Sequence, residues 1–148
     1  MQNGEVTSDE KLMAMLSHLS ILFGGIILPI ILWAVQKDKS KYVRYHSLQA
    51  IFFHIVYMAV IFIVVFLIVI VAVGFGIGFG SMSKGHHGSD GAFPALMMII
   101  MFAFYGVFFI SIIAAVAYEV FLAIKSYQGS YIKIPVIGNI IYKKVYGE

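Results

Sequence analysis

The sequence contains no cysteine and few charged residues. Of its 148 residues, 11% are charged and 61% are hydrophobic. The absence of cysteine excludes a disulfide framework, a thiol nucleophile and cysteine metal ligands. Water-soluble domains carry about a quarter of their residues as charged side chains, so the shortage of charge excludes a water-soluble globule. The composition indicates a membrane protein.

Long apolar runs account for this composition. Residues 12–35, 48–73 and 94–124 contain one charged residue among them, Glu119. A helix of about 20 residues crosses a hydrocarbon core of about 30 Å, and unbroken apolar runs fit helices better than the alternating strands of membrane barrels. The sequence predicts an all-α integral membrane protein, with three transmembrane helices in a single membrane domain over residues 1–148.

Local signals predict where the helices begin. Thr7 and Glu10 have the spacing of a capping box before the first span, Ser40 is suited to cap the second helix, and Pro94 suits the first turn of the third. The acidic, polar start lacks the basic region of a secretory signal, so we expect the first span to be retained.

Two polar segments flank the third span. Residues 74–93 are rich in glycine and serine, which predicts a flexible outer loop. Residues 125–148 alternate lysine and tyrosine with short apolar groups and are interrupted by Pro135 and Gly138. This pattern predicts a cytoplasmic segment at the membrane interface rather than a fourth span.

Basic residues gather on one side of the predicted spans. Eight of the ten follow the first or third span, and only Lys11 and Lys84 lie on the other side. Because basic flanks are retained in the cytoplasm, the N-terminus is predicted outside and the C-terminus inside a multi-pass protein of the plasma membrane. The eight are Lys37, Lys39, Lys41, Arg44, Lys125, Lys133, Lys143 and Lys144.

Polar residues inside the spans predict an interhelical cluster. Ionisable groups at membrane depth usually face the bundle interior, and His46 and Gln49 share a helical stripe, with His54 on its shoulder. We expect these three to meet Glu119 near the cytoplasmic end. Hydrogen bonding between helices is favoured over chemistry. The plainer alternative is that Glu119 reaches the headgroups near Lys125.

A second polar face is predicted along the first span, formed by His18, Gly25 and Pro29. Pro29 donates no backbone hydrogen bond and frees the Gly25 carbonyl, which predicts a bend there. His18 lies in the outer half of this span, so it is expected to lie too far from Glu119 to join that group. A hydrogen bond across the bundle is its expected role.

No metal or cofactor is expected. His86, His87 and Asp90 have side chains that bind metals, but a glycine-rich loop supplies no defined geometry. A formal charge of +3, divided between membrane flanks, makes no nucleic-acid groove. The expected partners are the lipid bilayer and either a second copy in a homo-oligomer or other membrane proteins.

Four motifs occur in order: "MLSHLS", "LPIILWAVQKDKS", "YVRYHSLQAIFF" and "AIKSYQGSYIKIPVIG". Together they resemble a family of small prokaryotic membrane proteins that is grouped with the twenty-kilodalton Tic subunit of the chloroplast protein-import translocon. The resemblance covers about residues 13–138 and assigns no catalytic residue. It implies an all-helical component of a complex that conducts preproteins. The matching positions include Lys37, Asp38, Ser40, His46, Gln49 and Gly129.

Three function classes follow from these features. The favoured one is a non-enzymatic membrane subunit or scaffold, Tic-like and engaged in transport. The alternative is a small stand-alone transporter or channel that uses His54, Glu119 and the carbonyl freed by Pro29. An intramembrane enzyme is disfavoured, because the spans contain no H-E-x-x-H or G-x-S-x-G motif.

Overall fold

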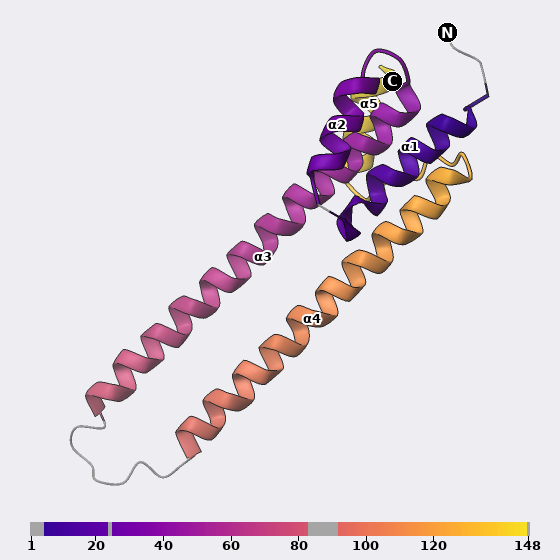
Figure 1. Ribbon diagram of the computed structural model, residues 1–148. Coiled ribbons are helices and arrows are strands. Elements are labelled where there is room, and N and C mark those ends of the chain that lie inside the picture. The colour runs from indigo at the N-terminus through magenta and orange to yellow at the C-terminus, as the bar shows by residue number, and fades with distance from the viewer. Residues whose placement is uncertain (1–4, 24, 83–91, 148) are drawn as a thin grey trace. The chain divides into compact units, whose positions relative to one another are not determined.

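The computed structural model describes residues 5–23, 25–82 and 92–147 (Figure 1). Within these ranges every regular element is helical, which confirms the predicted all-α class. The elements are α1 (Ser8–Leu19), the 3-10 helix η1 (Ser20–Leu22), α2 (Ile27–Gln36), α3 (Lys41–Met82), α4 (Ala92–Tyr127) and α5 (Ile137–Tyr146).

The chain forms two compact units. The first comprises Met1–Tyr57 and Ala114–Glu148, and the second comprises Met58–Ile113. Helices α1, α2 and α5 belong wholly to the first unit, whereas α3 and α4 contribute residues to both.

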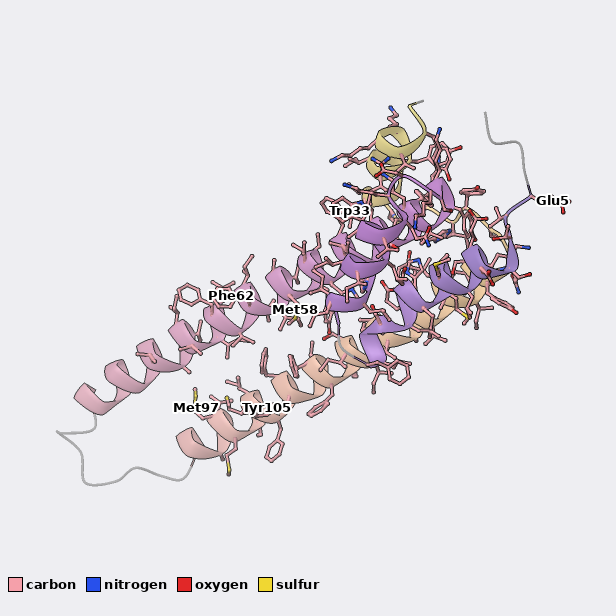
Figure 2. The ribbon with its side chains drawn as sticks, turned by 45° about the horizontal axis from the view of Figure 1, so that its top comes forward. Glu5, Trp33, Met58, Phe62, Met97 and Tyr105 are labelled. Carbon is pink, nitrogen blue, oxygen red and sulfur yellow. The ribbon has the colours of Figure 1, made fainter. Side chains whose placement is uncertain are left out.

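Helices α3 and α4 are long and apolar enough to cross a membrane. Their candidate spans are Lys41–Gly74, with a mean hydropathy of 3.4, and Ala95–Tyr127, with a mean hydropathy of 2.6. Side chains of the second unit project outward (Figure 2), and Phe62 is 71% exposed. A surface of this kind is stable in hydrocarbon, where a helix satisfies its own backbone groups.

These helices extend beyond the predicted spans. Helix α3 continues to Met82, so helix occupies the first half of the loop predicted for residues 74–93. Glycine is a poor helix former in water, but a chain in lipid must satisfy its backbone hydrogen bonds internally. Pro94 falls in the first turn of α4, as predicted. Residues 83–91 of the predicted loop lie outside the described residues.

The span predicted for residues 12–35 is not one continuous helix, so the prediction of three spans is not confirmed. Helix α1 ends at Leu19, and Gly25 adopts a left-handed backbone with φ of 64°. The Gly25 N–H donates to the Ser20 carbonyl at 2.8 Å and closes the turn. Glycine adopts this conformation without the steric cost of a side chain.

Pro29 is not the position of the bend. It lies in the first turn of α2, where its missing N–H would have had no acceptor within the helix. The sequence prediction placed the bend at Pro29, but the chain turns earlier, at Gly25. His18 and Pro29 therefore lie on two different helices, which run side by side in Figure 1.

The two short helices form an antiparallel hairpin. Near its open end, the Gln36 Nε2 atom of α2 lies 3.2 Å from the Met13 Sδ atom of α1. The predicted capping box is present, because the Glu10 carboxylate accepts the Thr7 N–H at 2.8 Å while the Glu10 N–H donates to the Thr7 hydroxyl. Partial burial raises the pKa of Glu10, but hydrogen bonds from Ser40 and Thr7 outweigh burial and lower the pKa overall.

Helix α5 packs against the beginning of α3. Tyr45 of α3 forms a buried core with Ile141 and Val145 of α5. Gly138 permits a tight turn at the beginning of α5, because a Cβ atom there would lie 2.6 Å from the Lys133 Cα atom of the preceding segment. The tail predicted as an interfacial segment therefore contains a packed helix, and its position at the membrane interface stays a prediction.

Gly25→Ala is expected to lower the free energy of unfolding in detergent by about 1–2 kcal/mol, since a side chain disfavours the left-handed conformation. Gly106→Ala is the control. Gly106 lies within α4 and has open space around an added Cβ, so alanine there should be neutral or stabilise by up to about 1 kcal/mol. Chemical denaturation followed by circular dichroism measures both values. Equal effects of the two substitutions would contradict the assigned turn.

Candidate functional site

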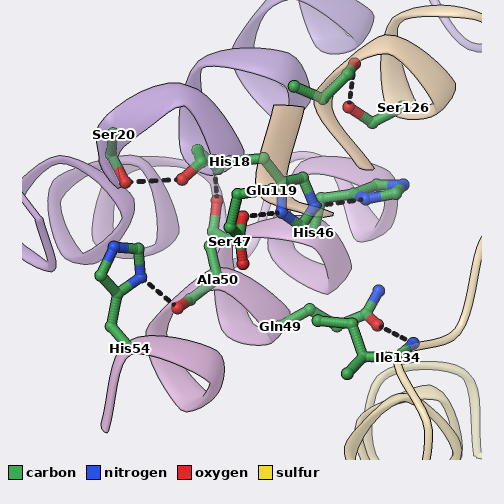
Figure 3. A network of polar contacts seen from close by, with 12 residues as sticks. His18, Ser20, His46, Ser47, Gln49, Ala50, His54, Glu119, Ser126 and Ile134 are labelled. Atoms are coloured by element: carbon green, nitrogen blue, oxygen red, sulfur yellow. Dashed lines mark hydrogen bonds and ion pairs between the residues drawn. The ribbon is translucent and has the colours of Figure 1, made fainter. Parts of the chain in front are cut away.

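Three buried ionisable side chains meet in the first unit (Figure 3). His18 comes from α1, His46 from α3 and Glu119 from α4. The His18 Nδ1 atom lies 2.8 Å from the Glu119 Oε2 atom, and the His18 Nε2 atom lies 3.2 Å from the His46 Nδ1 atom. Each of the three residues is at most 1% exposed. This Glu119–His18–His46 network joins three helices through one continuous chain of hydrogen bonds.

Small residues bring the helices close enough for these contacts. The Ser17 and Ser47 hydroxyls are 2.8 Å apart, directly beside the two histidines in the sequence. The Ser20 hydroxyl donates to the Ser17 carbonyl within the same segment. Small side chains allow close helix packing in membranes, and their hydroxyls can hydrogen-bond between helices.

Three arrangements of protons satisfy the network. With Glu119 protonated and both histidines neutral, the Glu119 Oε2–H donates to His18 Nδ1 and the His18 Nε2–H donates to His46 Nδ1. With Glu119 ionised and His18 neutral, the His18 Nδ1–H donates to the carboxylate and the His46 Nδ1–H donates to His18 Nε2. With His18 protonated, both of its nitrogens donate and His46 Nδ1 accepts. Each arrangement gives both nitrogens of His18 and the Nδ1 atom of His46 a hydrogen-bond partner, so these three atoms need no further ligand.

The ends of this network are closed. The Glu119 Oε1 and His46 Nε2 atoms are buried without a hydrogen-bond partner. Leaving a buried polar atom unpaired costs about 1–3 kcal/mol. The two unpaired end atoms therefore reduce the stability that the hydrogen bonds of the network add. Protein encloses all three side chains.

Gln49 was predicted to meet Glu119 but contacts a different segment. Its Nε2 atom donates to the Ile132 carbonyl at 3.1 Å, and its Oε1 atom accepts the Ile134 N–H at 2.8 Å. Both hydrogen bonds fix the chain between α4 and α5. Gln49 is fully buried and, as Figure 3 shows, points toward Ile134.

His54 also differs from its prediction. Its Nδ1 atom donates to the Ala50 carbonyl of its own helix at 2.7 Å. The expected pair with Glu119 is not among the hydrogen bonds of the described residues, in which His18 is the partner of that carboxylate. His54 therefore lies beside the network without joining it.

The prediction that His18 lies too far from Glu119 is wrong. It assumed a straight first span, in which His18 would lie at a different depth. Because the chain reverses at Gly25, α1 is instead a short helix that lies beside the C-terminal part of α4, which contains Glu119. One sequence signal could have suggested the contact: serine flanks the histidine in both "LSHLS" and "YHSLQ", which is typical of polar, close-packed helix faces.

Further contacts that the sequence did not predict hold the end of α4. The Tyr42 hydroxyl donates to the Ser126 carbonyl, and the Ser126 hydroxyl donates to the Ala123 carbonyl. A tyrosine near the end of a span commonly anchors a helix at the headgroups, but the Tyr42 side chain is buried. Tyrosine serves either purpose, because its ring is apolar and its hydroxyl is polar, and the sequence alone does not distinguish them.

The described residues contain no group of three histidine, aspartate or glutamate side chains placed to hold a metal ion. His86, His87 and Asp90, the potential ligands in the predicted outer loop, lie outside these residues, as does Lys84. The basic residues predicted to set the orientation all belong to the first unit.

A comparison with protein-family models identifies a match over residues 9–141. That family is MamF/MmsF, described as the magnetosome magnetite crystal formation protein family. No curated protein and no solved structure matches the chain. The match contradicts the Tic-like resemblance and, with it, the predicted translocon and protein-transport role. The short motifs at the helix ends reflect how polar and apolar segments meet at a membrane, which is too general to identify a translocon. The chain belongs to the MamF/MmsF family of magnetosome magnetite crystal formation proteins.

Proposed function

We propose that this protein acts in magnetite crystal formation as a helical protein of the magnetosome membrane, without catalysing a reaction itself. The family match over residues 9–141 carries this proposal. The two apolar helices support it, because they agree with a location in a membrane. The magnetosome membrane replaces the plasma membrane of the sequence prediction.

The buried network supports a structural role. Glu119, His18 and His46 are ionisable side chains that the structure brings together, and each is enclosed by protein. Acid–base catalysis by this network would need at least one of the three to reach a substrate. Their hydrogen bonds instead join α1, α3 and α4, as expected for polar contacts between membrane helices.

The apolar parts of α3 and α4 also lack a reactive group. Residues 58–82 and 95–113 contain no histidine and no charged side chain. Polar or ionisable residues mark the pathways of ions and protons through membranes. This composition favours helices that hold the protein in the bilayer over helices that line a conduit.

The basic residues support an orientation. Lys37 and Lys39 precede α3, and Lys125 lies at the end of α4. By the rule that basic flanks remain in the cytoplasm, α3 and α4 cross the membrane as a pair and place the C-terminal segment on the cytoplasmic face. Lipid is the partner that the exposed apolar surface supports best. Association with a second copy or with other membrane proteins stays a prediction.

Expression of this chain in a magnetosome-forming cell that lacks its own MamF/MmsF protein tests the function. We expect crystal size, measured by electron microscopy, to return to the parental distribution. An empty vector is the control for expression, and purified magnetosomes establish the location. Unchanged crystals, despite the protein being present in the magnetosome membrane at normal abundance, would contradict the proposal.

Substitutions of Glu119 test the structural role of the network. Glu119→Leu removes the acceptor of His18 and should lower the free energy of unfolding by about 1–3 kcal/mol. Glu119→Gln retains a side-chain oxygen that accepts from His18 Nδ1–H, so its cost should be below about 1 kcal/mol. Denaturation in detergent measures both. The glutamine variant should also restore crystal size as the parent does, and loss of crystal formation in a fully folded glutamine variant would show that ionisation matters.

A further inference from the structure

We infer that the α1–α2 hairpin enters only one leaflet of the bilayer, from the face that carries most of the basic residues, and that its apolar surface contacts the acyl chains of that leaflet. Residues 9 and 39 then lie on the same side of the membrane. This inference reverses the predicted outside location of the N-terminal segment. It does not rest on the proposed role in crystal formation.

The contacts of α1 with α4 set its direction. Lys11 lies beside the end of α4, because its Cε atom is 3.2 Å from the position of a Cβ atom on Gly129. Seven residues further along α1, His18 contacts Glu119, which lies ten residues before Gly129. Later residues of α1 thus contact earlier residues of α4, which lie nearer the membrane interior. Helix α1 therefore begins beside the basic end of α4.

Helix α2 returns to the same end. The Gln36 side chain, at the end of α2, contacts Met13 in the first half of α1. Four residues, 37–40, connect α2 to α3, and the Ser40 hydroxyl accepts the Val43 N–H at the beginning of α3. The beginnings of α1 and α3 and the ends of α2 and α4 therefore lie together.

The lengths of the two helices fit half of a bilayer. Helix α1 has 12 residues and α2 has 10, which correspond to about 18 Å and about 15 Å at 1.5 Å per residue. A hydrocarbon core is about 30 Å thick and requires about 20 helical residues to cross. Each helix reaches roughly the middle of the bilayer, and the turn around Gly25 lies at that depth.

The hairpin presents apolar side chains outward and polar side chains inward. Ser17, His18 and Ser20 are fully buried against the other helices. No charged residue occurs between Lys11 and Lys37, so charge is confined to the open end. The exposed apolar side chains are Leu22, Phe23, Ile27, Ile30, Ile31 and Val35, with Phe23 81% exposed.

Acyl chains are the occupant that fits this surface. The same unit exposes further apolar side chains on the segments that belong to the candidate spans, including Phe52 and Ile55 on α3 and Phe121 on α4. The hairpin surface is thus an additional part of a lipid-facing exterior. Water around these side chains would be unfavourable, because apolar surface is more stable in a hydrocarbon environment than in water.

Single cysteines test the sidedness, because the chain has no cysteine of its own. Asp9→Cys, Lys39→Cys and Gln128→Cys place thiols at exposed positions, and Ser89→Cys marks the connection between the two spans. Each variant is treated with a membrane-impermeant maleimide in spheroplasts and in inverted vesicles. We expect positions 9, 39 and 128 to react together in inverted vesicles, and position 89 to react in spheroplasts.

Phe23→Cys tests the depth of the turn. This thiol should resist the reagent from both sides and react only after the membrane is dissolved in sodium dodecyl sulfate. Reaction of position 9 on the side of position 89, or from both sides, would overturn the single-leaflet topology. Reaction of position 23 in intact membranes to the extent of position 39 would show that the hairpin lies in water, which would also overturn the inference. Equal membrane abundance of all variants serves as the folding control.

Discussion

The structure depends on one constraint: a polar group inside a bilayer has no water to bond with and must find a partner in the protein. His18 meets this constraint by linking Glu119 to His46 and thereby joins α1, α3 and α4. Gln49 does the same for the backbone between α4 and α5. Both contacts fix elements that lie far apart in the sequence, so the fold of the first unit follows from where polar groups are satisfied.

The same constraint bears on whether the histidine–glutamate pair has a structural or a chemical role. A histidine next to a glutamate resembles a catalytic or proton-transferring pair when only residue types are considered. Here both groups are enclosed, and residues 58–82 of α3 and 95–113 of α4 contain no histidine and no charged side chain to continue a pathway. The hydrogen bonds of the network join α1, α3 and α4 in a chain that belongs to the magnetosome magnetite crystal formation family.

The hairpin shows how a short irregularity changes membrane topology. A run of 24 residues without charge satisfies the length criterion for a span, and hydropathy does not detect a reversal within it. Gly25 allows the reversal because it accepts a positive φ, and Pro29 follows in the first turn of the next helix. Hydropathy measures whether a segment enters lipid, whereas backbone conformation decides whether it crosses.

The sequence by itself determined the helical class, the two long apolar helices, the capping box at Thr7 and Glu10, and the candidate polar residues. These properties are local, because they depend on composition, periodicity and neighbouring residues. Tertiary structure decided that His18 rather than His54 or Gln49 contacts Glu119. That choice depends on how α1, the short helix before the turn at Gly25, packs against α4, and on the close approach at Ser17 and Ser47. Both are long-range consequences of packing, which no local pattern encodes.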